Sequence, residues 1–554
     1  MQTLFRRLAL AASMVAVAAC ANKEILNVPN LNNPDVARTY ATPAGVESVV
    51  SSVYRQVWGA MVSCGDCINT QAHSFSLENY SELNNNVMNI RSIIPRGPIG
   101  NDRSGSGTGA NYGAFRDLSK ATRSAANGLQ ALDRLVAASA LVPKNALGSK
   151  AQDTRAKAFG FMSIGWALGG LAMAYDSAAI VTPATLSDEV PGLSASKDVA
   201  AAAIRMLDSA IAYATSPDVA NGTNGFPLPA TWINGNAMTA AQFVAFVKSQ
   251  RARIRAGMAR TPADRAAVDW NAVIADAQAG ITADFQITLN VSAGWSGNAP
   301  FDTNEAYSSA ARHQLSLLIG GMADTSGAYA IFIATPLQSR DGTFLIRTPD
   351  TRFPQGATRA AQQAETILPL TAPRYIRNRP TGDDVPGLGY GSSQYEYRRW
   401  MPVNLAQGNG PWTNIAKIEM DMLIAEGQIR AGNFAAATVL IDASRARHGL
   451  GSIGTITSAA QQIAGGGACV PKVPQAPAFN TVGCGTILEA MKWEKRLETM
   501  FSCAFMCWYL DSRGWGDLPE GTAVQWPVPY QEMDARIQPF YGMAGQTAKG
   551  TYGW

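Results

Sequence analysis

The stretch "AEGQIRAGNFAAATVLIDASRARHGL", residues 425–450, decides the fold, because it has the pattern of two helices joined by a tight turn. Gly432 stands where a left-handed residue ends a helix, and Asn433 follows it as a candidate N-cap. We predict helices over 413–431 and 433–448. Four apolar residues recur at steps of four, three and four and share one face of the first helix: Ile418, Met422, Ala425 and Ile429.

Small side chains would let these two helices approach closely. Ala425, Ala436 and Ala437 are typical of tetratricopeptide-like helix pairs, although an unrelated helix pair has the same pattern. Arg445 and Arg447 fall at the end of the second helix, where cations meet the negative end of the helix dipole. Glu419 and Glu426 on the first helix are candidate partners for these arginines, and Glu494, Arg496 and Glu498 form a candidate ion network. We interpret the hairpin as a scaffold.

The same periodicity continues along the chain and predicts a mostly α fold. Residues 285–412 differ, because they are dense in Gly, Pro, Ser and aromatic residues, with short β-like pieces such as "TFLIRT" (343–348). We expect tetratricopeptide-like helix pairs in an N-terminal part over 36–284. A loop-rich insert and C-terminal helices would follow over 285–554, in one compact unit with the first part. The other predicted helices are 38–62, 110–141, 150–178, 196–215, 238–260, 268–281 and 486–512.

The N-terminus has the pattern of an export signal. "MQTLFRRLALAASMVAVAAC" carries two arginines, then an apolar run too short to cross a bilayer, then small residues. Its end, "VAAC", resembles the lipobox of bacterial lipoproteins, in which the cysteine is acylated and becomes the first mature residue. We predict a signal peptide over 1–19 and a lipidated tether over 20–35 with diacylglycerol and a fatty acid such as palmitate on Cys20. An ordinary secretory signal that contains a cysteine is the alternative.

Six further cysteines remain, and an even number in an exported chain favours disulfides. Cys469 and Cys484 are the best candidates, because they would close the loop between them. Cys64 and Cys67 could form a redox motif, half of a zinc site or a structural pair. The chain has only three histidines and no βαβ pattern around this motif, which favours the structural pair.

Composition and motifs argue against several functions. A net charge of +4 with 16% charged residues is too weak for nucleic-acid binding. The HExxH, GxSxG and P-loop motifs are absent from the sequence, and Asp383 and Asp384 stand beside a glycine, where turn-forming aspartates are the default. We predict a binding protein rather than an enzyme, with no cofactor or metal.

Sugars stack their apolar faces on aromatic rings, and loops can expose such rings. We predict ligand contacts from the insert and from the loop after the first helix, although packing inside the protein is the competing interpretation for each aromatic residue. Small neighbours around Trp295 suggest that its ring is exposed, whereas Trp508, Trp515 and Trp526 are assigned to the core. The predicted ligand-binding residues are Trp295, Tyr307, Tyr390, Tyr395, Asn84, Asn86 and Arg91.

Two stretches together carry a family resemblance. Residues 415–450 have a helix with Ala-Glu, a glycine turn, a second helix and then Arg-x-Arg-x-Gly-Leu. Residues 487–533 have a Glu-x-Arg helix, an Asp/Arg/Trp-Gly segment and a closing Pro-x-Pro-x-x-Glu. With the lipobox and the "LNNPD" tether, the chain resembles the SusD/RagB family of outer-membrane nutrient-uptake lipoproteins. Two departures, Ser502-Cys503 after Phe501 and "LDSRGWG", indicate a divergent branch.

The resemblance implies a SusD-like fold and a non-catalytic role. Such proteins act as lids on a partner TonB-dependent outer-membrane transporter, which is SusC-like, and they deliver oligosaccharides or, in some members, peptides to it. We therefore expect an oligosaccharide-binding lipoprotein, lipid-anchored in the outer membrane and facing the cell surface. A peptide or other small-nutrient binder on the same fold, a lipid-anchored glycosidase and a structural envelope protein are the alternatives.

Overall fold

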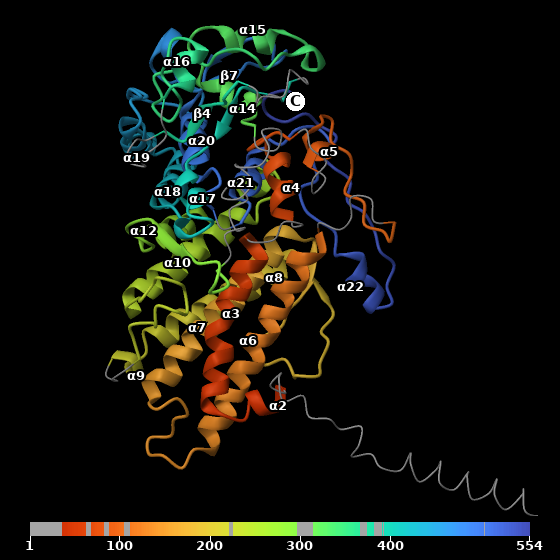
Figure 1. Ribbon diagram of the computed structural model, residues 1–554, viewed down its shortest axis with the longest axis vertical. Coiled ribbons are helices and arrows are strands. Elements are labelled where there is room, and N and C mark those ends of the chain that lie inside the picture. The colour runs from red at the N-terminus through yellow and green to blue at the C-terminus, as the bar shows by residue number, and fades with distance from the viewer. Residues whose placement is uncertain are drawn as a thin grey trace, which may run out of the picture.

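Helices dominate the architecture, as predicted (Figure 1). The computed structural model describes residues 36–62, 68–81, 88–104, 111–220, 225–295, 314–365, 374–381, 390–391, 393–503 and 505–554. Within these residues every β-sheet has two antiparallel strands.

Four long helices form the N-terminal bundle at one end of the molecule (Figure 1). Helix α7 lies at its centre, against the other three, and is therefore buried along almost its whole length. A Cβ atom at Gly165 would lie 2.7 Å from Leu207, so glycine lets α7 and α8 approach each other closely. The helices are α3 (Pro43–Val62), α6 (Tyr112–Ala138), α7 (Lys150–Ala174) and α8 (Ser196–Ala214).

A second group of helices continues the stack: α10 (Ala240–Gly257), α12 (Trp270–Gln278), α18 (Lys417–Arg430), α19 (Phe434–Arg447) and α20 (Ile487–Thr499). In the α18–α19 hairpin the four residues predicted to share one face are all buried. Gly432 has φ +77°, the left-handed conformation expected of it. The side chain of Asn433 does not cap α19 but donates to Gln428. The hairpin is thus confirmed, and only its N-cap is wrong.

The helix predicted over 486–512 is two helices, α20 and α21 (Cys507–Trp515). Phe501 and Met506 take positive φ values of 47° and 52° between them, and the Phe501 N–H donates to the Glu78 carboxylate at 2.8 Å. A disulfide also joins Cys503 to Cys507. Glu78 lies far away in the sequence, and positive φ values are incompatible with a helix. The sequence pattern does not reveal the break, because the apolar residues continue across it.

The loop-rich insert begins and ends on the same small sheet. Strand β3 (Phe285–Leu289) pairs with β6 (Gly410–Ile415), so residues more than one hundred positions apart lie side by side. The start of the helix predicted from 413 is therefore a strand, because its backbone pairs with β3. "TFLIRT" forms no strand; β4 (Ile376–Asn378) and β5 (Tyr395–Tyr397) pair instead.

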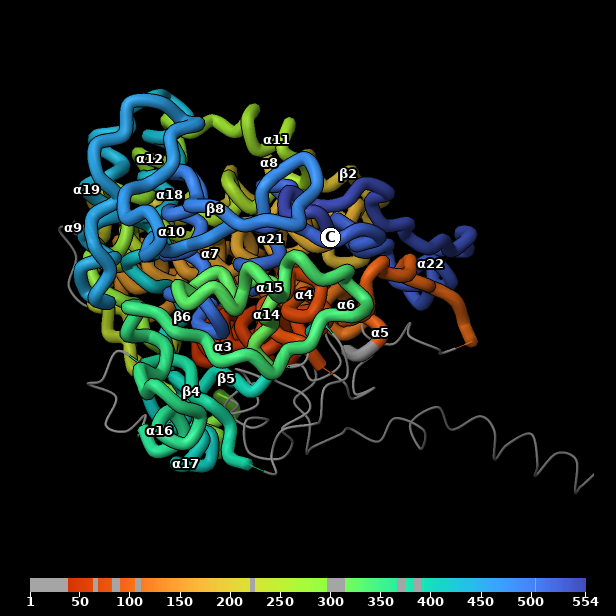
Figure 2. The backbone as a smooth tube through the Cα atoms, turned by 90° about the horizontal axis from the view of Figure 1, so that it is seen from above, coloured from red at the N-terminus to blue at the C-terminus, as the bar shows by residue number. Residues whose placement is uncertain are grey.

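The remaining elements are short. In Figure 1 helices α14–α16 lie at the end opposite the N-terminal bundle, and Figure 2 shows the insert, in green to cyan, along one side. The helices are α2 (Val36–Thr39), α4 (Ile68–Phe75), α5 (Met88–Ser92), α9 (Pro217–Ala220), α11 (Pro262–Ala266), α14 (Leu317–Gly320), α15 (Ala328–Ala334), α16 (Arg359–Gln363), α17 (Met401–Leu405) and α22 (Tyr530–Ala535), with the 3-10 turns η3 (Gly321–Ala323), η4 (Leu337–Ser339) and η5 (Gly466–Ala468). The strand pairs are β1 (Ser177–Ala179) with β2 (Leu193–Ala195) and β7 (Lys472–Pro474) with β8 (Val482–Cys484).

Candidate functional site

The ring of Trp295 is not exposed, so that expectation is wrong. Only 4% of the residue is accessible, and its ring packs against Trp58 on α3 with centroids 5.3 Å apart. A backbone bridge from Asn290 to Trp295 folds the chain after β3 back on itself. The small sequence neighbours of Trp295 leave room locally, but α3 supplies the cover from elsewhere in the fold.

The structure brings Tyr390 and Arg91 to the same region, where the loop after the first helices meets the insert. The Tyr390 hydroxyl accepts the Ile94 N–H at 2.5 Å, and its ring meets Tyr80 edge to face. Arg91 donates to Gln71 at 2.9 Å. Tyr390 and Arg91 are both buried, so their hydrogen bonds serve packing.

The other predicted residues divide into buried ones and ones outside the described part of the chain. Tyr395 is fully buried, and its hydroxyl bonds to Gln362 and to the Ile346 N–H, both at 2.8 Å. Trp508, Trp515 and Trp526 are core residues, as expected. The structure joins Cys469 to Cys484, the predicted disulfide. Outside the described residues lie Cys20, Cys64, Cys67, Asn84, Asn86 and Tyr307.

A polar pocket of about 180 Å³ opens where the insert meets the C-terminal helices. Each of its walls comes from a different element. The β3–β6 pairing sets Asp284 beside the start of α18, and Asp284 accepts the Lys417 N–H at 2.8 Å. The polar pocket is lined by seven ionisable side chains: Asp284, Tyr375, Arg399, Lys417, Arg447, His448 and Glu498.

Glu498, at the end of α20, is a fixed anion in this polar pocket. Its carboxylate lies 2.7 Å from Nε2 of His448 and 3.2 Å from the Arg352 guanidinium, and it accepts the Tyr375 hydroxyl at 3.0 Å. Burial opposes its charge, but the hydrogen bond from His448 and the positive charges of Arg352 and Arg399 hold the pKa of Glu498 well below its usual range.

Two guanidinium groups face the polar pocket. Arg399 donates to the Glu498 carbonyl at 2.9 Å and stacks on the Tyr375 ring at 4.4 Å. Burial opposes its charge, but Tyr397, Tyr375 and Glu498 raise the pKa of Arg399 above its usual value. Arg447 ends α19 and is exposed. Among the described residues neither arginine forms an ion pair with a carboxylate.

A wider groove of about 460 Å³ adjoins the polar pocket, because Asp284 lines both. It runs between the start of α10 and residues 280–285. Asn236, Gln242 and Thr282 supply polar groups along it. The groove is otherwise lined mainly by apolar residues, so a mixed polar and apolar opening adjoins the polar pocket at Asp284.

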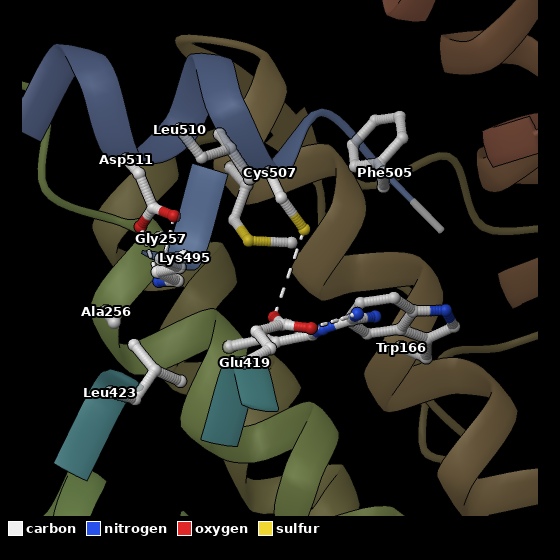
Figure 3. A pocket seen from close by; sticks show the side chains of 12 residues that line it. Trp166, Ala256, Gly257, Glu419, Leu423, Lys495, Phe505, Cys507, Leu510 and Asp511 are labelled. Atoms are coloured by element: carbon white, nitrogen blue, oxygen red, sulfur yellow. Dashed lines mark hydrogen bonds and ion pairs between the residues drawn. The ribbon is translucent and has the colours of Figure 1, made fainter. Parts of the chain in front are cut away.

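A third opening lies deep among the helices and is much smaller (Figure 3). Its volume of about 20 Å³ is enough for a water molecule and far too small for a sugar. Two buried ion pairs flank it, Arg253 with Glu419 and Lys495 with Asp511. We interpret this cavity as part of the core.

Sequence reasoning missed most of the polar pocket. Arg447 was singled out, but only as a helix-end cation, and Glu498 only as a member of an ion network. Arg445 does serve structure, because it is buried and donates to the carbonyls of Gly451 and Val470. Its predicted partners are wrong: Glu419 pairs with Arg253 and Glu426 with Arg265, because these arginines from the other helices lie nearer. No local signal could have joined residues 284, 375, 399 and 447.

No group of three or more metal-binding side chains occurs among the described residues. In that same part of the chain, no helix has both the length and the apolar character to span a bilayer.

The comparisons with known proteins gave matches among solved structures only; no family model and no curated protein matches the chain. A SusD superfamily protein from Bacteroides thetaiotaomicron aligns with 91% of this chain and 94% of its own, at 9% identity and TM-score 0.48. A SusD-like protein from Bacteroides fragilis covers 95% of both chains, at 12% identity and TM-score 0.45. A SusD-like carbohydrate binding protein from Bacteroides vulgatus covers 92% and 90%, at 12% identity and TM-score 0.43. These matched structures are described as SusD superfamily or SusD-like proteins.

Proposed function

We propose that this protein is an exported lipoprotein that captures oligosaccharides at the outer membrane and delivers them to a TonB-dependent transporter. The observation that carries the binding role is the polar pocket with its adjoining groove. Together these openings reach the size of small-molecule sites in proteins. The anchor on Cys20, the surface location and the transporter partner rest on the lipobox and on the family motifs.

The chemistry of the polar pocket suits a ligand rich in hydroxyl groups. Arg399, Arg447 and Lys417 can donate hydrogen bonds, and Asp284 can accept them. Tyr375 adds a partly buried aromatic ring in the wall. A sugar needs both donors and acceptors around its ring, and this polar pocket supplies both within one enclosure.

Binding fits this site better than glycoside hydrolysis. Hydrolysis needs one carboxyl group that carries a proton to the leaving oxygen, with a raised pKa. Although burial opposes its charge, the hydrogen bond from His448 and the charges of Arg352 and Arg399 lower the pKa of Glu498, which disfavours the protonated form that this role needs. Asp284, the other carboxylate of the polar pocket, accepts the first amide of α18.

A peptide is the second candidate ligand, because the polar pocket carries both charges. Arg399 and Arg447 could bind a carboxyl terminus, while Asp284 could accept the ammonium group of an amino terminus. Oligosaccharide and peptide ligands therefore make different demands on the same side chains.

Calorimetry on the chain lacking residues 1–20 tests the proposal with neutral oligosaccharides, acidic oligosaccharides and tripeptides. Arg447→Ala is the test variant. Arg205→Ala is the matched control, because Arg205 is an exposed arginine on α8 outside the polar pocket. We expect saturable oligosaccharide binding that weakens in Arg447→Ala only. Binding of peptides alone would move the function to the second candidate, and binding unaffected by Arg447→Ala would exclude this polar pocket.

A further inference from the structure

The polar pocket has a charge imbalance that distinguishes one class of glycan from another. Arg399, Arg447 and Lys417 line it against two carboxylates, Asp284 and Glu498. Lys417 is already paired with Asp421, one turn along α18. The two arginines are different, because among the described residues no carboxylate neutralises either of them within ion-pair distance.

Both carboxylates of the polar pocket are already engaged. Glu498 is held by Arg352, His448 and Tyr375, and Arg399 adds a further positive charge near it. Asp284 accepts the Lys417 amide. An entering anion therefore meets two guanidinium groups that have no ion-pair partner among the described residues. Arg399 is already held by the Glu498 carbonyl and by Ser502, whereas Arg447 is exposed.

The backbone adds to the positive potential. Helix α18 begins at Lys417, beside the polar pocket, and Ala416 before it supplies no side-chain cap. The amino end of a helix carries the positive end of the helix dipole, which favours a nearby anion. The helix dipole adds to the attraction of the two arginines for an anion, but it would not form a binding site alone.

The volume of the polar pocket and the groove beside it indicate the size of the ligand. About 180 Å³ suits one compact ring, and the adjoining groove past Asp284 gives room for a chain that continues from it. Guanidinium groups bind carboxylates through paired hydrogen bonds of matching geometry. A neutral sugar would offer neither arginine an ion pair.

Resting on the proposed function, we propose that the preferred ligand is an oligosaccharide that ends in a uronic acid. Its carboxylate lies between Arg399 and Arg447, and the following sugars extend into the groove past Asp284. The compact acidic sugar fits the size of the polar pocket, and the rest of the oligosaccharide fits the larger groove.

The test compares each acidic probe with its methyl ester, which removes the negative charge and keeps the sugar chain. Calorimetry on the whole chain in detergent micelles uses trigalacturonate, a hyaluronan tetrasaccharide and the methyl esters of both. At least one acid should bind at least ten-fold more tightly than its ester. Arg447→Ala should remove that preference, and Arg205→Ala should keep it. The preference should also shrink as salt rises, because ions screen the attraction.

Three outcomes would overturn this inference, and they separate it from the proposed function. Equal binding of acids and esters, unchanged in Arg447→Ala, would leave glycan capture standing and refute the acidic preference. An acid preference that survives in Arg447→Ala would place the charge recognition elsewhere. Tripeptide binding with no response to any sugar would refute both the inference and the oligosaccharide role. Normal unfolding of Arg447→Ala would show that the variant is folded.

Discussion

Glu426 shows at the scale of single residues how this chain keeps charge inside its core. Its carboxylate binds the Arg265 guanidinium at 2.5 Å, and neither side chain is exposed. Trp515 donates to the same carboxylate at 3.1 Å. Burial alone would raise the pKa of Glu426, but Arg265 and then Arg430 lower it to about 2. Such a pair is costly to break, because the remaining charge stays buried.

We predict that Glu426→Gln lowers the free energy of unfolding by about 3–5 kcal/mol at pH 7, since Arg265 loses its closest partner. Urea denaturation measures the loss. Glu532→Gln is the control: Glu532 forms an i,i+4 pair with Arg536 on a short outer helix, and its loss should cost about 0.5 kcal/mol or less. Equal stability of the Glu426→Gln variant and the unmodified protein would contradict this account of the core.

Low pH should remove the stabilisation that the same Glu426–Arg265 pair provides. A carboxyl group whose pKa is lowered on folding stabilises the protein above its unfolded pKa, and this contribution is lost as the pH falls through the folded pKa. For Glu426 the loss runs from about pH 4.5 down to about pH 2. We expect the stability difference between the unmodified protein and Glu426→Gln to shrink across that window in urea titrations. A constant difference would show that Glu426 titrates normally.

For single residues, the sequence predicted the place in a helix better than the role of the side chain. Arg445 and Arg447 have the same chemistry and stand two residues apart at one helix end. The structure buries Arg445 and exposes Arg447 beside the polar pocket. The prediction that the Trp295 ring is exposed is wrong for the same reason. Local neighbours do not determine which face of a segment another element will cover.

At the scale of elements, apolar periodicity and turn residues predicted much of the helical stack. The α18–α19 hairpin follows from local chemistry, and the structure confirms it. The β3–β6 pair and the break between α20 and α21 do not, because each depends on a partner far along the chain. Local signals therefore predict the helices, whereas long-range contacts decide where they are interrupted.

The hairpin turn gives a prediction at this scale. Gly432 has φ +77° with open space around its Cβ position, so Gly432→Ala tests backbone strain alone. A left-handed alanine costs about 1–2 kcal/mol, which chemical denaturation resolves. Gly451→Ala is the control, because Gly451 also has open space but no positive φ. Equal effects of both substitutions would show that the left-handed turn contributes nothing.

At the scale of the whole molecule, the sequence predicted the mostly α architecture but not the site. The polar pocket joins residues 284, 375, 399, 417, 447 and 498, which no motif links. Only the β3–β6 pairing and the ends of α18, α19 and α20 bring them together. A site assembled from helix ends and loop ends has no local signature, whereas a helix pair has one.

The disulfide between Cys469 and Cys484 stabilises the outer part of the C-terminal region. It closes a loop with a sequence separation of 15 and encloses the β7–β8 hairpin. Replacing both cysteines with serine should lower the free energy of unfolding by about 2–3 kcal/mol, mainly because the unfolded chain gains freedom. Denaturation under non-reducing conditions measures this. Similar stability of the variant and the unmodified protein would show that this loop unfolds independently.

The most direct measurement is a crystal structure of the protein with trigalacturonate bound. The account predicts sugar density in the polar pocket, a carboxylate within hydrogen-bond distance of Arg399 and Arg447, and the following sugar beside Asp284. Ligand density at any other surface, with this polar pocket holding only solvent, would show that the polar pocket is not the ligand site.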